Sequence, residues 1–249
     1  MFWSKPKSPI TPEDQEWTEA NLNWLLDEFN EPKVKTVTPS KEFFNYQFTG
    51  KQQDAEYILE TVKKLMDIQS SNFDLQYFSE HNEDEYQKYG ISKSEGVNDN
   101  YEFANGTYQT TETGETIIRI ELNQLKNPVA LIATISHELA HHKLLGENRI
   151  EENDEFLTDL TAIFFGFGIF LNNSKFNFNQ WQDDNNQGWA MNTNGYLPKQ
   201  IINFAMAWLN LYRKDQTDVY AHLDNEGSKH YKKANKYLTY WLEKSENGY

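Results

Sequence analysis

The stretch that decides the fold is Pro128-Val-Ala-Leu-Ile-Ala-Thr-Ile-Ser-His137-Glu-Leu-Ala-His141-His-Lys-Leu-Leu145. Its apolar residues recur at spacings of three and four, which is the period of an α-helix. Pro128 suits the first turn of a helix, and Gly146, which follows the stretch, suits a helix end. The pattern therefore predicts a helix that begins at Pro128 and ends near Gly146.

Two histidines of this helix, His137 and His141, lie four residues apart, with Glu138 beside the first. Residues at this spacing project from one face of a helix, one turn apart, so two imidazoles can hold one zinc ion. Glu138 is placed to take a proton from water at that metal. The alternative is a polar helix face whose histidines contact solvent or carboxylates. His142 points about 100° away from His141, which favours a surface or supporting position.

A second helix is predicted from Asp154 onward, and it carries acids for a third ligand. A catalytic zinc takes three protein ligands and leaves a fourth position open. Glu155 and Asp159 lie four residues apart beside a long apolar run, where a carboxylate needs a partner. Glu155 can bind the metal, and Asp159 can accept a hydrogen bond from a ring nitrogen of His137 or His141. Direct ligation by Asp159 is the main alternative.

The sequence His137-Glu-Leu-Ala-His141, followed by Glu155-x-x-x-Asp159, resembles the gluzincin class of zinc metallopeptidases, the thermolysin-like clan. The resemblance implies that His137, His141 and Glu155 bind zinc, that Glu138 is the general base and that Asp159 orients a ligand. The chain departs from the class because only thirteen residues separate His141 from Glu155, fewer than in better-known members. This segment also holds rival acids, namely Glu147, Glu151, Glu152 and Asp154.

The resemblance covers residues from about 104 to 172 and implies a zincin-like fold of class α+β. Such a fold has a small twisted sheet, an edge strand beside the active-site helix and a mostly helical C-terminal part. We therefore expect one zincin-like domain over residues 1–249. Its parts would be helices and the small sheet (1–125), the metal-binding helix pair (126–172) and a helical C-terminal subdomain (173–249).

Residues 104–122 predict a β-hairpin that leads into the metal-binding helix. Ile118, Ile120 and Leu122 alternate onto one face, as in a strand with one buried face. In zincins the edge strand pairs with the substrate backbone, so the resemblance implies Gly106, Thr107 and Tyr108 as substrate-binding residues. An exposed strand edge is a template for an extended peptide. An ordinary edge strand that binds no ligand is the alternative.

The remaining elements follow from periodicity and capping signals. Residues 160–171 are apolar almost all round but too short to span a bilayer, so they predict one buried core helix. Gly166 and Gly168 would let another helix approach it closely. A strand is predicted at residues 73–78, and Ser228 is expected to cap the last helix. The other helices are expected at residues 12–29, 51–68, 198–213 and 229–244.

Composition limits the partners and the kind of metal site. The 249 residues include no cysteine, so any metal must be held by histidine and carboxylate, which suits Zn²⁺ and also admits manganese, iron or cobalt. The net charge of −15 argues against nucleic acid and anionic membrane as partners. The N-terminus has no apolar core of a signal peptide, and the expected location is cytoplasmic.

The function that these residues predict is zinc-dependent hydrolysis of peptide bonds in a peptide or protein substrate. One alternative is a catalytically silent, peptidase-like protein that uses the same cleft to hold a partner. Another is a helical protein with a structural zinc, although such a site is usually closed by a fourth protein ligand. Peptide hydrolysis also needs a group that steadies the oxyanion. The candidates for that role are Tyr196, Arg213, His222 and His230.

Overall fold

The computed structural model describes residues 5–69, 72–79, 106–110, 116–174 and 196–246. Its fold is mostly helical α+β, with a small three-stranded mixed sheet and a helical C-terminal part, as the predicted class requires. The chain forms two compact units, entering the second after Thr38 and returning to the first after Asp154. One unit contains the sheet and the helix that carries His137 and His141, and the other is helical.

The sheet has the strand order β1-β3-β2, with β1 at Phe73–Phe78, β2 at Gly106–Thr110 and β3 at Thr116–Glu121. β2 and β3 are antiparallel, with Tyr108 opposite Ile118, which confirms the predicted pair of strands. Residues 104–105 and 111–115 of the predicted hairpin lie outside the described residues. β1 pairs parallel to β3. β2 is therefore an edge strand of this three-stranded sheet.

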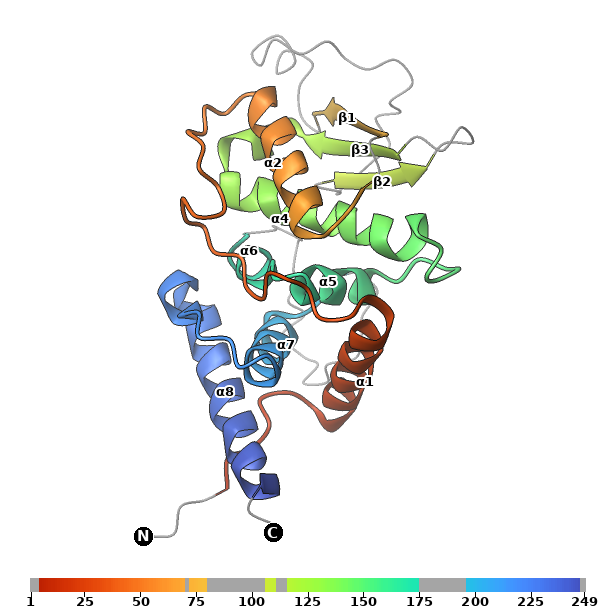
Figure 1. Cartoon of the computed structure of the whole chain (residues 1–249). Coiled ribbons are helices and arrows are strands. Elements are labelled where there is room, and N and C mark those ends of the chain that lie inside the picture. The colour runs from red at the N-terminus through yellow and green to blue at the C-terminus, as the bar shows by residue number, and fades with distance from the viewer. Residues whose placement is uncertain (1–4, 70–71, 80–105, 111–115, 175–195, 247–249) are drawn as a thin grey trace, which may run out of the picture. The chain divides into compact units, whose positions relative to one another are not determined.

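The helix α4 (Pro128–His141), which carries His137 and His141, packs on the sheet through β2 and β3, and α2 (Gln52–Leu65) packs against α4 (Figure 1). Pro128 occupies its first turn, and the side chain of Asn127 accepts a hydrogen bond from the Ala130 N–H. Every side chain from Leu131 to His141 is buried. Beyond His141 the helix widens into a π turn, His142–Gly146, so the predicted end at Gly146 is confirmed.

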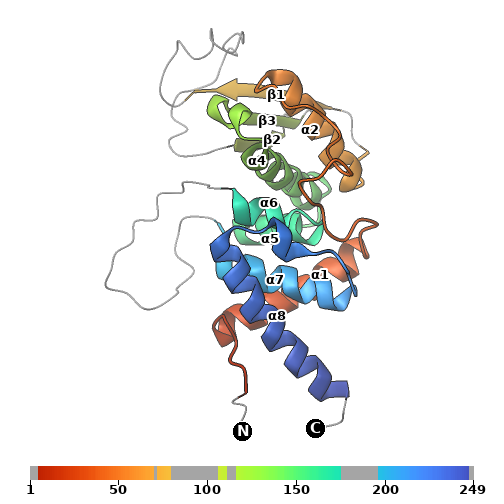
Figure 2. The same cartoon turned by 90° about the vertical axis from the view of Figure 1, so that its left-hand side faces the viewer.

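The helical unit is built around α7 (Lys199–Tyr212), which contacts the four other α-helices that the structure describes in this unit (Figure 2). The N-terminal helix of this unit begins at Pro12, as predicted, because the side chain of the preceding residue, Thr11, accepts a hydrogen bond from the Asp14 N–H. The four helices are α1 (Pro12–Phe29), α5 (Glu155–Phe164), α6 (Gly168–Asn173) and α8 (Asn225–Glu246). None of the helices within the described ranges has the length and hydropathy that a membrane span requires.

The prediction of one continuous core helix over residues 160–171 is wrong. The segment is buried, but it divides into α5 and α6 at Gly166, whose φ of +96° lies in the left-handed region. The Val37 N–H donates a hydrogen bond to the Gly166 carbonyl at 3.0 Å. A carbonyl that bonds to a neighbouring segment and a left-handed residue together end a helix. The expected close approach at Gly168 is confirmed, since a Cβ there would lie 2.5 Å from Met206 Cγ.

The start predicted for the last helix is also wrong. α8 begins at Asn225, four residues before the predicted Lys229, so Ser228 lies within its first turn. The Asp224 carboxylate accepts a hydrogen bond from the Gly227 N–H at 2.6 Å, and the Asp224 carbonyl accepts one from the Ser228 N–H. Asp224 therefore occupies the capping position, for which aspartate and serine are about equally suited.

Gly166→Ala should lower the free energy of unfolding, as measured by urea denaturation. A left-handed alanine costs about 1–2 kcal/mol, and its Cβ would lie 3.1 Å from the Lys35 carbonyl oxygen, which adds about 1–3 kcal/mol of crowding. Gly50→Ala is the matched control: φ is +75°, but the Cβ would lie 3.6 Å from its nearest neighbour. Equal losses in the two variants would contradict the crowding argument.

Candidate metal centre

Two ligand positions come from the last turns of α4. His137 and His141 are buried, and their Nε2 atoms face each other at 3.2 Å with the rings nearly perpendicular. Two nitrogen donors at ordinary zinc bond lengths and tetrahedral angles lie about 3.3 Å apart. The imidazoles therefore have the separation of two corners of a zinc tetrahedron.

Glu155, the first residue of α5, supplies the third donor. Its side chain is half-buried, and the donor atoms of His137, His141 and Glu155 all lie within 4.8 Å of one another. Among the described residues, these three form the group of histidine and acidic side chains that could hold a metal ion. Two imidazoles and one carboxylate suit zinc and leave its fourth position to a non-protein ligand.

The rival acids between His141 and Glu155 occupy other environments. Glu147 accepts a hydrogen bond from the buried Lys143 ammonium at 2.6 Å and lies 3.5 Å from the Arg149 guanidinium. A carboxylate in two ion pairs has its charge compensated by the protein. The three other acids of this segment, Glu151, Glu152 and Asp154, are exposed.

Asp159 lies on α5 one turn after Glu155 and is buried, at 4% exposure. Its Oδ2 accepts a hydrogen bond from the Leu197 N–H at 2.9 Å, so it fixes the segment that leads into α7. Asp159 is not a member of the donor group found within the described residues. Its predicted hydrogen bond to a histidine ligand stays a prediction.

Glu138 follows His137 on α4 and is almost fully buried, at 3% exposure. The side chain is therefore surrounded by protein in the same two turns of helix that carry the imidazoles. A buried carboxylate interacts more strongly with a charge or proton than one in water does. The role of general base stays a prediction for Glu138.

Tyr108, on the edge strand β2, contacts the helix α4. Its ring stacks on the His141 ring, with centroids 5.8 Å apart and planes inclined by 28°. Its hydroxyl lies 3.4 Å from Nδ1 of His142, which is half-buried, and burial lowers the pKa of that imidazole. The sequence reasoning assigned Tyr108 to substrate through its strand and missed this ring contact. The substrate-binding role of Gly106, Thr107 and Tyr108 stays a prediction.

Arg213, one candidate for oxyanion stabilisation, has structural contacts. Its side chain is buried at 4% exposure, donates to the Lys35 carbonyl at 3.3 Å and lies 4.8 Å from the centre of the Phe164 ring. The Lys35 ammonium in turn donates to the Arg213 carbonyl. Burial lowers the pKa of Arg213 to about 10, so it stays charged at neutral pH. Its Nε and Nη2 atoms are buried and have no hydrogen-bond partner among the described residues.

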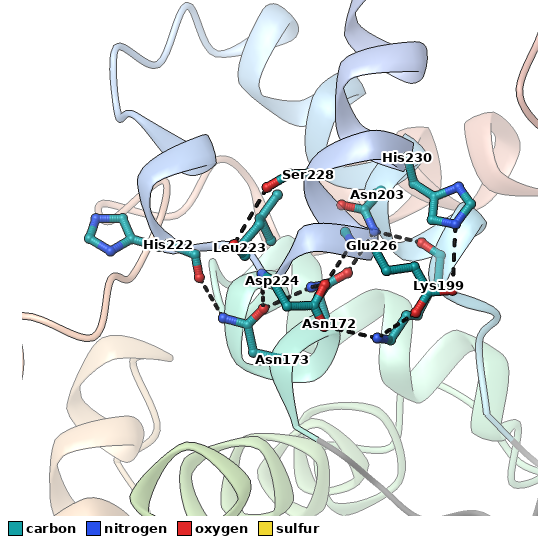
Figure 3. Close-up of polar contacts among 11 residues, drawn as sticks. Asn172, Asn173, Lys199, Asn203, His222, Leu223, Asp224, Glu226, Ser228 and His230 are labelled. Atoms are coloured by element: carbon teal, nitrogen blue, oxygen red, sulfur yellow. Dashed lines mark hydrogen bonds and ion pairs between the residues drawn. The ribbon is translucent and has the colours of Figure 1, made fainter.

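His222 and His230 belong to a polar network between α6, α7 and α8 (Figure 3). The Asn173 side-chain amide donates to the His222 carbonyl, and Asn173 Oδ1 accepts from the Asp224 N–H at 2.9 Å. The His230 Nε2 lies 3.9 Å from the Glu226 carboxylate, one turn earlier on α8. Tyr196, the fourth candidate, is half-buried. Which of the four residues steadies an oxyanion stays a prediction.

Asp224→Asn should lower the free energy of unfolding at neutral pH and change it little in acid. Burial raises the pKa of Asp224, but hydrogen bonds from the Gly227 N–H and the Lys199 ammonium outweigh it, so the pKa is lowered. The carboxylate therefore stabilises the fold above its ordinary pKa of about 4, and this contribution disappears as pH falls through the lowered value. Urea unfolding of the wild type and of Asp224→Asn, from neutral to acid pH, measures this effect. A difference in unfolding free energy that grows in acid would contradict the prediction.

The chain was compared with models of protein families, with curated proteins and with solved structures, and nothing matches it. Its chemistry must therefore be inferred from the donor group and its surroundings.

Proposed function

We propose that this chain is a zinc-dependent peptidase of the gluzincin type. The observation that carries the proposal is the group of donors from His137, His141 and Glu155 within 4.8 Å, with buried Glu138 next to the first of them. A structural zinc usually has four protein ligands, whereas a catalytic zinc has three and an open position. A donor group of three among the described residues, beside the buried Glu138, favours catalysis.

When bound, zinc would polarise the substrate carbonyl and lower the pKa of water at the site. Glu138 accepts the proton of the attacking water and then donates it to the nitrogen of the leaving amine. One carboxyl group thus serves both transfers and ends the cycle ionised. Asp159 is proposed to hold one histidine ring in the tautomer that ligation needs.

The proposed substrate is an extended peptide that lies along β2. β2 is an edge strand of the three-stranded sheet and packs against α4, so a peptide added there would run beside the metal-binding helix. Backbone groups of Gly106, Thr107 and Tyr108 would provide its hydrogen bonds. The net charge of −15 supports a peptide substrate over nucleic acid or an anionic membrane.

The test has two steps. Purified protein is first assayed for metal by atomic emission, with His137→Ala as the ligand variant and His230→Ala as the matched control on α8. We expect zinc in the wild type and the control and its loss in His137→Ala. A peptide library is then incubated with the zinc-loaded protein, with and without chelator. Cleavage that the chelator abolishes supports the proposal. Zinc binding without cleavage would indicate a catalytically silent binding protein. A protein that binds no zinc would exclude both the peptidase and the silent zinc-binding protein.

A further inference from the structure

The side chain of Tyr108 lies between the metal-binding helix and the turn that follows it. Along β2, Tyr108 is half-buried and the next residue, Gln109, is exposed, as expected for a strand with one covered face. The Tyr108 backbone is opposite Ile118, a fully buried residue of β3. The phenol is therefore fixed at the side of the strand that faces α4.

Three groups converge where the phenol ends. A Cβ built on Gly146 would lie 2.6 Å from the Tyr108 hydroxyl and 2.5 Å from Nδ1 of His142. These two atoms are 3.4 Å from each other. A Cβ at residue 146 would require one of these two side chains to move, so glycine at this position admits both ring ends as they lie. The π turn His142–Gly146 is thus shaped around the phenol.

His142 is held from its other side by β1. The Phe73 ring meets the His142 ring at 5.0 Å between centroids, inclined by 66°, and the Lys63 ammonium lies 5.0 Å from the Phe73 ring centre. Lys63 is itself buried and paired with Glu60. His142 therefore has a fixed position. Tyr108 contacts both histidines: its hydroxyl lies near His142, and its ring stacks on His141.

We infer that Tyr108 is a positioning residue for the metal centre, which sets the ring orientation of His141 through stacking, while Gly146 provides the space that this requires. The inference rests on the proposed zinc site and adds to it a residue that binds no metal. Residues that orient ligands typically change metal affinity by about 10- to 100-fold when they are removed. The stacked face, not the hydroxyl, carries most of the effect on His141, because the ring is what contacts that imidazole.

The experiment compares metal binding by Tyr108→Leu, Tyr108→Phe and Gly146→Ala. Zinc affinity is measured by competition with a chromophoric chelator, and the visible absorption of the Co²⁺-loaded protein reports ligand geometry. We expect Tyr108→Leu and Gly146→Ala to lose roughly 10-fold or more in zinc affinity and to shift the Co²⁺ bands. Tyr108→Phe, which keeps the stacked ring, should restore affinity to within about threefold of the wild type.

Tyr57→Leu is the matched control, because it removes a tyrosine of α2 that stacks on Tyr46 at 4.4 Å. It should leave affinity and spectrum unchanged. Circular dichroism checks folding, and if Tyr108→Leu does not fold, Gly146→Ala decides the question. Wild-type affinity and spectrum in both Tyr108→Leu and Gly146→Ala would overturn the positioning role while the proposed peptidase stands. A wild type that binds no zinc would overturn both.

Discussion

Glu138→Gln should lower kcat of the proposed peptide hydrolysis by about 10²- to 10⁴-fold, the usual contribution of a general acid–base group. Glutamine has nearly the same shape but does not take up a proton. Glu138 is buried on the helix that carries His137 and His141, so the substitution changes the proposed base without altering an exposed surface. Zinc content should stay at the wild-type value, since the metal is proposed to use His137, His141 and Glu155. The measurement is steady-state cleavage of a fluorogenic peptide at saturating zinc.

Glu152→Gln is the matched control for this result. Glu152 lies between the second and third ligands in sequence, but it is exposed and lies outside the donor group. The same chemical change there should leave kcat within about twofold of the wild type, as for surface substitutions in general. Full activity in Glu138→Gln would show that Glu138 is not the general base. Loss of zinc in that variant would instead make Glu138 a ligand.

Glu155→Gln should cost more zinc affinity than Asp159→Asn. The first change removes a charged donor from the group that surrounds the metal position, whereas the second alters a residue proposed to orient a ligand. Loss of an orienting partner typically costs about 10- to 100-fold, and loss of a ligand costs more. Asparagine keeps an oxygen that can accept the Leu197 N–H, so the hydrogen bond that Asp159 makes in the structure is preserved. Chelator competition measures both affinities.

Glu151→Gln provides the control, because Glu151 is an exposed acid of the same connecting segment. Its zinc affinity should equal that of the wild type. The reverse order, with Asp159→Asn more damaging than Glu155→Gln, would support direct ligation by Asp159, the alternative left open by the sequence. Equal and small losses in both variants would mean that neither acid approaches the metal.

Local signals in the sequence were sufficient for the elements that carry the site. The period of three and four residues, Pro128 and Gly146 fix α4, and Thr11 followed by proline fixes the start of α1. The spacing of His137 and His141 is a property of any helix, so their convergence follows once the helix is predicted. Glu155 was predictable for a related reason, since it begins the next apolar helix.

The elements that were mispredicted depend on contacts between distant segments. Gly166 ends α5 because its carbonyl accepts from Val37, far earlier in the chain, and glycine within an apolar run does not reveal that partner. Asp224 and Ser228 are both good caps, and the contacts of Asp224 with Gly227 and Lys199 decide between them. The stacking of Tyr108 on His141 depends on the register of β2 against β3 and could not be read from periodicity.

The thirteen residues between His141 and Glu155 also bear on how the molecule folds. All three donors fall within residues 137–155, a stretch of 19 residues, so joining them closes only a short loop. Loop closure costs less entropy when the loop is short, and contacts of low sequence separation form early. A cation bound by these donors would therefore link α4 to α5 before β1 pairs with β3, whose partners, such as Phe73 and Thr116, lie much farther apart in the chain. Zinc present from the start of refolding should then accelerate it, rather than only stabilising the finished protein.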